Sequence, residues 1–179
     1  MKPPAQMPHR LPIRSLLWSV DVPAREVVSS LCTNTGRIFL AGGCAEGVVA
    51  AVDMELSETP GAPNILWQQD APSIISSPVA TEQFLFTLSE AADLTCRRAS
   101  DGRVLWSEII SQDPCYASLI LAGTKLYAVD LAGTISLYKA AAGFKKLGEF
   151  NLNEAVYATP ALAGKNLFVR SETHLYCLR

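Results

Sequence analysis

Residues that could carry out catalysis are few in this chain. Its two histidines are His9, in a proline-rich N-terminal stretch, and His174, near the C-terminus. A Ser-His-Asp or Cys-His site would have to use one of them, and no G-x-S-x-G segment presents a nucleophilic serine. We expect His174, at a turn-to-strand position, to be structural or solvent-facing. The carboxylates are scattered, without the pairing that glycoside hydrolysis needs. We therefore predict no catalytic residue and no enzyme activity.

Sulfur chemistry and phosphate binding are also poorly supported. The five cysteines are odd in number, irregular in spacing and without a C-x-x-C pair: Cys32, Cys44, Cys96, Cys115 and Cys177. A disulfide framework or zinc site needs a different pattern, so we predict free, buried thiols. The glycine-rich stretch AGGCAEG at 41–47 matches neither G-x-G-x-x-G nor a phosphate loop, and predicts a hairpin loop.

Bulk composition excludes several classes of partner. The 179 residues are 49% hydrophobic and 18% charged, with a net charge of −2. This charge gives no basic footprint for nucleic acid or an anionic membrane. No apolar run reaches the about 20 residues of a membrane-spanning helix. Residues 1–14 are broken by prolines and lack the apolar core of a signal peptide, so we predict a flexible arm, with the cytoplasm as the default compartment.

A repeat organises the rest of the chain. The segments SLCTNTGRIFLA, SPVATEQFLFTL, SLILAGTKLYAV and TPALAGKNLFVR begin at Ser30, Ser77, Ser118 and Thr159. The last two intervals are equal, and the loop MELSETPGAPN makes the first one longer. Each segment carries an aliphatic–aromatic pair at the same place: Ile38-Phe39, Leu85-Phe86, Leu126-Tyr127 and Leu167-Phe168. Each is then followed by a short turn and another apolar strand. A fixed period of about 40 residues is typical of repeat architectures.

A further element recurs around tryptophan, at Trp18, Trp67 and Trp106. In the third copy, Leu147 follows Trp106 by one repeat period and is predicted to take the same place. The second copy reaches its tryptophan through Asp101-Gly102, a dipeptide that favours a tight hairpin turn. All these segments are short, rich in aliphatic and aromatic residues and bounded by turn formers, so they predict strands and almost no helix.

Four strands per period of about 40 residues predict an all-β fold, a β-propeller of four-stranded antiparallel blades with about four blades in this chain. We place an outer strand at 15–22 and repeats at about 27–70, 73–109, 115–151 and 156–179. The last repeat has three strands, and the strand at Trp18 has the phase of the missing fourth. If Trp18 pairs alongside HLYCLR, the termini share one blade and no sheet edge stays open.

Three arrangements satisfy this count. The chain closes as a four-bladed ring, or two chains combine into an eight-bladed ring with twofold symmetry, or the chain is a piece of a longer propeller. The second and third are preferred, because the repeats are similar to those of larger propellers.

The segment SIISSPVATEQFLFTLSEAADLTCRRASDGRVLW resembles one copy of the PQQ-like propeller repeat. VYATPALAGKNLFVRSETHLYCLR looks like the closing repeat of BamB-like proteins, and LLWSVDVPAREVVSSL like their opening. The PQQ-like superfamily includes quinoprotein alcohol dehydrogenases and the outer-membrane assembly lipoprotein BamB. The resemblance covers about residues 15–179 and is specific for the repeat rather than for an activity.

The resemblance does not extend to the quinone site. Quinoprotein dehydrogenases use an eight-bladed ring, a calcium ion, a catalytic aspartate and usually a vicinal disulfide, and no two cysteines are adjacent here. The acidic residues fall in turns at different repeat phases and suit no calcium site: Asp53, Asp93, Asp101 and Asp130. We expect neither PQQ nor calcium nor another cofactor. The aromatic repeat residues are predicted to be structural: Trp18, Trp67, Trp106, Phe39, Phe86, Tyr127 and Phe168.

A rigid propeller with variable loops predicts a non-catalytic binding or scaffold module, with a protein partner at the loop faces and a homodimer as one assembly. The long loop MELSETPGAPN is expected to be the most divergent surface. The alternative is a fragment or subunit of a larger propeller enzyme, an oxidoreductase or hydrolase, whose active site lies outside this chain. Fold alone does not decide between them.

Overall fold

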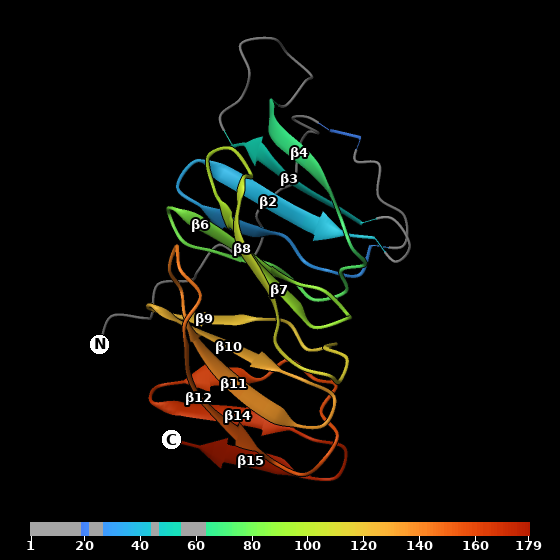
Figure 1. The fold of residues 1–179 in the computed structure, drawn as a ribbon, viewed down its shortest axis with the longest axis vertical. Helices are drawn as coiled ribbons and strands as arrows, with labels where there is room; N and C mark the ends of the chain where they lie inside the picture. Colours follow the sequence, from blue (N-terminus) through green and yellow to red (C-terminus); the bar gives the residue numbers. More distant parts are fainter. Residues whose placement is uncertain (1–18, 22–26, 44–46, 55–63) are drawn as a thin grey trace, which may run out of the picture.

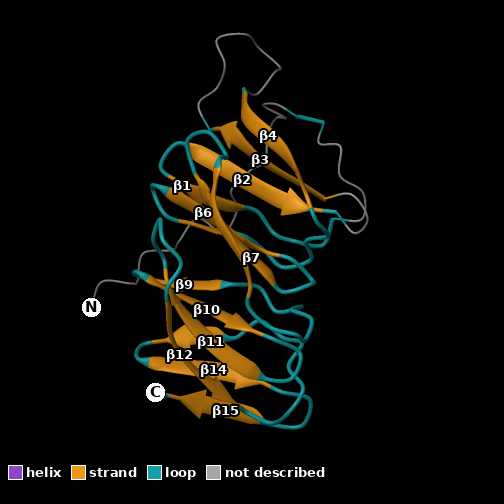
Figure 2. Ribbon diagram, in the orientation of Figure 1, coloured by secondary structure: helices purple, strands orange, loops and turns teal. Residues whose placement is uncertain are grey.

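The fold is described from a computed structural model, which describes residues 19–21, 27–43, 47–54 and 64–179. In these residues fifteen strands form four antiparallel sheets, joined by loops and turns without a helix (Figure 2). The first two sheets hold β1 (Cys32–Asn34), β2 (Arg37–Gly42), β3 (Gly47–Asp53), β4 (Ile65–Ala71), and β5 (Val79–Ala80), β6 (Phe84–Leu88), β7 (Asp93–Arg98), β8 (Val104–Ile109). The last two hold β9 (Ile120–Ala122), β10 (Lys125–Val129), β11 (Thr134–Lys139), β12 (Lys146–Asn151), and β13 (Ala161–Ala163), β14 (Asn166–Arg170), β15 (Leu175–Leu178).

Each sheet is a meander whose strands pair in chain order, which makes it a propeller blade. The all-β propeller prediction is therefore confirmed. The fourth blade has three strands, and β15 is its last strand within the described residues. Among those residues no helix is long and apolar enough to cross a membrane.

The aliphatic–aromatic pair of each copy explains how neighbouring blades pack. Side chains alternate between the two faces of a strand, so the two members of a pair point to opposite neighbours. Leu85 of the second blade packs in one cluster with Phe39 of the first blade. Leu126 of the third blade packs with Phe86 of the second. The aliphatic member therefore faces the preceding blade and the aromatic member faces the following blade.

The four blades form an open stack. Figure 1 shows the β1–β4 sheet at the top, the β13–β15 sheet at the bottom and the other two between them. The described part of the chain therefore has the form of a half or fragment of a larger propeller, and its four sheets do not close into a four-bladed ring. Trp18 lies outside the described residues, so its pairing with the last blade remains a prediction. The adjacent residues 19–21, drawn in the deepest blue, lie at the end of the stack that holds the first blade.

The Ser or Thr that begins each copy links the blades. The backbone N–H of Ser30 donates to Ser77 Oγ, that of Ser77 to Ser118 Oγ, and that of Ser118 to Thr159 Oγ1, each at 2.9 Å. A second series joins backbone groups: Ile74 N–H donates to Gly43 O (3.1 Å), Cys115 N–H to Glu90 O (3.0 Å) and Val156 N–H to Leu131 O (3.2 Å). Both series repeat from blade to blade, so they fix the blade spacing together with the apolar clusters.

Candidate functional site

Tryptophan side chains form hydrogen bonds between the first three blades, from the last strand of one blade to a turn of the next. Trp67 of the first blade donates its Nε1–H to Ala99 O in the β7–β8 turn of the second blade, at 3.0 Å. Trp106 of the second blade donates to Ala141 O in the β11–β12 turn of the third, at 3.1 Å. Buried indoles need a partner for this N–H, and the turn of the next blade supplies it.

The third blade departs from this pattern. In the first two blades Trp67 lies opposite Ala51 and Trp106 opposite Cys96, and a bulge follows. In the third blade Gly148 lies opposite Leu137.

The prediction for Leu147 is therefore wrong. Leu147 falls on the bulge and is 43% exposed, and glycine occupies the tryptophan position. The physical reason is that the β11–β12 connection is one residue longer than the β7–β8 connection, which shifts the register of β12.

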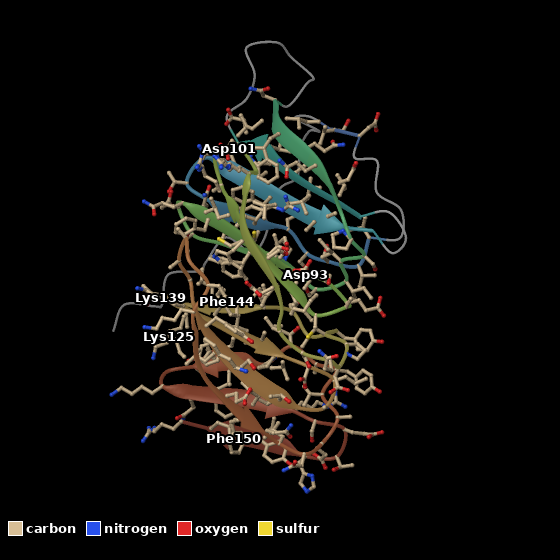
Figure 3. All side chains as sticks on the ribbon, in the orientation of Figure 1. Asp93, Asp101, Lys125, Lys139, Phe144 and Phe150 are labelled. Carbon is tan, nitrogen blue, oxygen red and sulfur yellow. The ribbon has the colours of Figure 1, made fainter. Side chains whose placement is uncertain are left out.

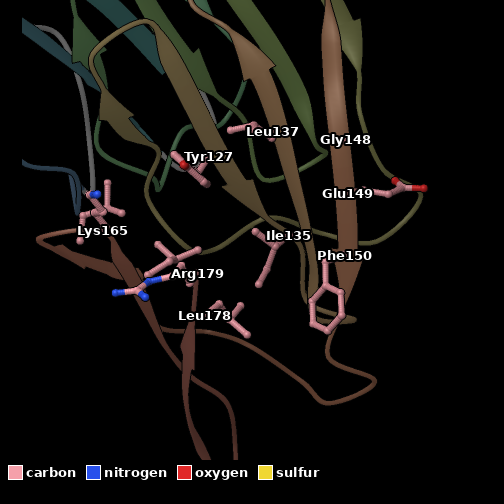
Figure 4. Close-up of a pocket in the computed structure, with 11 residues that line it drawn as sticks. Tyr127, Ile135, Leu137, Gly148, Glu149, Phe150, Lys165, Leu178 and Arg179 are labelled. Carbon is pink, nitrogen blue, oxygen red and sulfur yellow. The ribbon is translucent and has the colours of Figure 1, made fainter.

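An apolar cleft lies between the third and fourth blades, beside Gly148. Its volume is about 450 Å³, and its walls come from Tyr127, Ile135, Leu137, Gly148, Glu149, Phe150, Leu162, Lys165, Leu167, Leu178 and Arg179. Figure 4 shows Ile135 and Leu178 in its floor, Lys165 and Arg179 at one side, and Glu149 pointing away from them. A Cβ added at Gly148 would meet no atom within 4 Å. The cleft is therefore the space that an indole fills at the two preceding junctions.

A second feature is an aromatic surface made by Tyr116 and Tyr157, called here the tyrosine surface. The residues occupy the same repeat position, in the loops that precede β9 and β13. Their rings stack with centroids 6.0 Å apart and planes 12° apart, and Tyr157 is 59% exposed. Burial and the hydrogen-bonded carboxylate of Glu90 raise the pKa of Tyr116, so its hydroxyl stays protonated at neutral pH. Tyr157 is exposed and Tyr116 half-buried, so the pair offers aromatic surface with the Glu90 carboxylate beside it.

Glu154 organises the loop beside Tyr157. Its carboxylate accepts hydrogen bonds from Ser171 Oγ, Thr173 Oγ1, His174 Nδ1 (2.9 Å) and Tyr176 OH (3.2 Å). Hydrogen bonds from Ser171, then Thr173 and His174, lower the pKa of Glu154 to about 2. A carboxylate held this firmly is a structural anchor, and it carries a negative charge three residues before Tyr157 in the same loop.

His174 lies in the exposed β14–β15 turn, where its side chain is 66% exposed. Its Nδ1 lies 2.9 Å from Glu154, and its ring centroid lies 5.8 Å from that of Tyr176. His9 and Cys44, the other residues considered for chemistry, lie outside the described residues, as does most of the loop MELSETPGAPN.

The described cysteines are free thiols: Cys32, Cys96, Cys115 and Cys177. The prediction that the thiols are buried is wrong for Cys177, which is exposed because no further blade covers the last sheet within the described residues. Burial raises the pKa of Cys32, of Cys96 and of Cys115 to about 12 each, so these three carry no thiolate at neutral pH. In the described ranges no three His, Cys, Asp or Glu side chains are grouped so that they could hold a metal ion.

The predicted aromatic residues separate into two groups. Phe39, Phe86 and Trp67 are buried at blade junctions, and Trp106 is half-buried between Phe86 and Phe144, with centroids at 6.1 and 5.3 Å. Tyr127 lines the cleft, whereas Phe168 faces away from the third blade. Sequence reasoning missed the tyrosine surface, although the equal spacing of the two tyrosines within the repeat could have indicated it.

Comparison with known proteins identifies the family and similar folds. The family model described as "Outer membrane protein assembly factor BamB" matches residues 15–179. The crystal structure of BamB from Moraxella catarrhalis is similar with a TM-score of 0.73 at 11% identity, covering 92% of this chain and 49% of that chain. No curated protein matches this sequence.

Two computationally designed proteins are also similar. Ika4 has a TM-score of 0.70 at 12% identity, covering 93% of this chain and all of that chain. Ika8 has a TM-score of 0.69 at 11% identity, covering 90% of this chain and 48% of that chain. The chain thus spans about half the length of BamB and of Ika8.

Proposed function

The chain belongs to the family of the outer membrane protein assembly factor BamB, and on that premise we propose that it is a non-catalytic β-propeller that binds a protein partner. The observation that carries this proposal is the tyrosine surface. Tyrosine is enriched in protein–protein interfaces because one side chain offers a large apolar ring and a polar tip. The two rings stack on loops that a rigid pair of blades supports, so little order has to be gained on binding.

Charge around the tyrosine surface specifies the partner further. Glu90 is hydrogen-bonded to Tyr116, and Glu154 lies three residues from Tyr157 in the same loop. The low pKa of Glu154 keeps it negative over the physiological range. The expected ligand is therefore an extended segment of a protein with an apolar side chain to cover the rings and a lysine or arginine to meet the carboxylates.

Among the described residues considered for catalysis, Cys96, Cys115 and His174 are buried or hydrogen-bonded to other residues. The thiols of Cys96 and Cys115 are held protonated by burial, and Glu154 takes up the Nδ1 side of His174. These contacts support a binding role, and we propose that neither PQQ nor calcium takes part. We also propose that two copies form the working assembly, because one chain spans about half of BamB.

Selection from a library of displayed peptides tests the binding proposal. The wild-type protein should enrich one family of peptides with an apolar and a basic residue. Tyr157→Ser should lose these peptides and remain folded, since the side chain is 59% exposed.

Lys125→Ala is the matched control and should retain the peptides. Figure 3 places Lys125 beside the strand ends that the β9–β10 turn connects, and the tyrosine loops join the opposite ends of the strands. Peptides that bind the two variants equally well would refute the proposal.

A further inference from the structure

The first blade exposes a side chain that every later blade buries. The residue three positions before the Ser or Thr of each copy packs onto the preceding blade: Ile74, Cys115 and Val156 are 2%, 1% and 0% exposed. Val27 holds the same repeat position in the first copy and is 56% exposed, and the adjacent Val28 is 67% exposed. Val48 and Val52, on the outer face of the same blade, are buried, whereas Val27, Val28 and Leu31 (63%) stay exposed.

The last blade shows the complementary feature. In the first three blades the face toward the next blade carries Val49, Leu94 and Ile135, which are 0%, 0% and 6% exposed. The register places Leu175 at this position, opposite Arg170, just as Ile135 lies opposite Val129. Leu175 is 73% exposed.

The internal junctions show which of these residues meet. Val49 shares a cluster with Ile74 of the next blade, and Leu94 shares one with Cys115. Ile135 shares one with Val156. The next pair in this series is Leu175 with a Val27 from another chain. Leu175 belongs to the last blade and Val27 to the first, and these two blades lie at opposite ends of the stack (Figure 1).

The hydrogen-bond series end in the same complementary way. Within the described part of the chain, Ser30 Oγ receives no N–H from a preceding blade, and the N–H of Thr159 has no following hydroxyl. In the backbone series the next acceptor is the carbonyl of Glu172 and the next donor is the N–H of Val27. The first blade is therefore left with the Val27 N–H donor and the Ser30 Oγ acceptor. The last blade is left with the Thr159 N–H donor and the Glu172 carbonyl acceptor, in positions that match across a junction.

We propose that a second copy of this chain docks head to tail on these ends, with Leu175 of one copy packed against Val27 of the other. This continues an interface that the chain already forms three times. Each junction joins the last blade of one copy to the first blade of the other. Twofold symmetry then forms this junction twice, and the two copies close into one ring. Two chains that each span 49% of BamB supply the length of one such protein. The inference rests on the two-copy assembly named under Proposed function.

Solution mass, measured by light scattering after gel filtration, tests this junction. The wild-type protein is expected at twice the 19.3 kDa chain mass, and Leu175→Glu and Val27→Lys are each expected at 19.3 kDa. An equal mixture of the two variants should return to the doubled mass, because one junction then pairs Glu with Lys and the other is wild type. Ile109→Glu changes an equally exposed residue (62%) away from both ends and should stay dimeric.

The proposal is overturned if the wild-type protein is a monomer or forms assemblies larger than two copies. It is also overturned if Leu175→Glu and Val27→Lys keep the doubled mass, or if their mixture stays monomeric. Circular dichroism of the variants checks that they are folded. Peptide binding by monomeric Leu175→Glu separates the two proposals, since the tyrosine surface does not depend on the junction.

Discussion

Filling the cleft beside Gly148 should stabilise the protein. Leucine at this position would point into the space that Trp67 and Trp106 occupy at the preceding junctions. A Cβ there meets nothing within 4 Å, and the backbone of Gly148 does not have the positive φ that favours glycine. The cleft volume of about 450 Å³ exceeds the size of a leucine side chain, so no neighbour has to move.

The expected gain follows from two favourable contributions and one cost. Replacing glycine in a strand removes a penalty of roughly 0.5–1 kcal/mol. Full burial of leucine contributes about 1.5–3 kcal/mol, of which we count about half, because Phe150 at the cleft is 56% exposed. Ordering the side chain costs about 0.5–1 kcal/mol. The net expectation for Gly148→Leu is a gain of about 1 kcal/mol in the free energy of unfolding, or roughly 2–4 °C in Tm for a domain of this size.

Urea unfolding followed by fluorescence and calorimetry measures this gain. Gly143→Leu is the matched control, because Gly143 also has open space around its Cβ position but lies in an exposed loop. The control should gain at most the backbone contribution of replacing glycine, about 0.4–1 kcal/mol, without any contribution from burial. If Gly148→Leu is no more stable than Gly143→Leu, the cleft is not an unfilled tryptophan position and the reasoning is refuted.

Three further predictions use other parts of the structure. Trp106→Ala should lower the free energy of unfolding by about 2–4 kcal/mol, because the packing of the indole and its hydrogen bond to Ala141 are lost. This is slightly less than the loss for a fully buried tryptophan. A difference from wild type of less than about 1 kcal/mol in urea unfolding, on the order of that for an exposed residue, would contradict this. The pKa of Glu154 is about 2 in the folded protein against an ordinary value of 4.5. The ionised carboxylate therefore stabilises the fold above pH 4.5, and this stabilisation is lost as the pH falls through about 2. The difference in free energy of unfolding between wild type and Glu154→Gln should shrink over this window, and a constant difference would contradict the hydrogen-bond network around Glu154. In the monomeric Leu175→Glu variant, alkylation by iodoacetamide, read by peptide mass spectrometry, should modify exposed Cys177 well before buried Cys96 and Cys115. Equal rates would contradict the burial of Cys96 and Cys115 at the blade junctions.

The repeat made the fold predictable from sequence. Four gap-free segments with an aliphatic–aromatic pair identified the blades, and the structure adds the reason for the pair. Leu85 faces the preceding blade and Phe86 the following one, so one dipeptide serves two junctions. The Ser or Thr at the start of each copy was visible as a pattern, but its role in linking the blades required the hydrogen bonds of the structure.

The site was less predictable, for local reasons. Counting one repeat period from Trp106 pointed to Leu147, and a connection longer by one residue moved Gly148 into the tryptophan position. Only the observed pairing, in which Gly148 lies opposite Leu137, shows this shift. The tyrosine surface depends on the approach of two loops that lie one repeat apart in the sequence, which only the packing of the third and fourth blades brings about.

The central claim is that the tyrosine surface binds a protein segment. Its most direct test is the affinity of one selected peptide, measured by fluorescence polarisation, for wild type and for Tyr157→Ser. A residue at the centre of an interface contributes about 2 kcal/mol or more, so the account predicts a loss of about 30-fold or more, with Lys125→Ala unchanged. Equal affinity for wild type and Tyr157→Ser would contradict it.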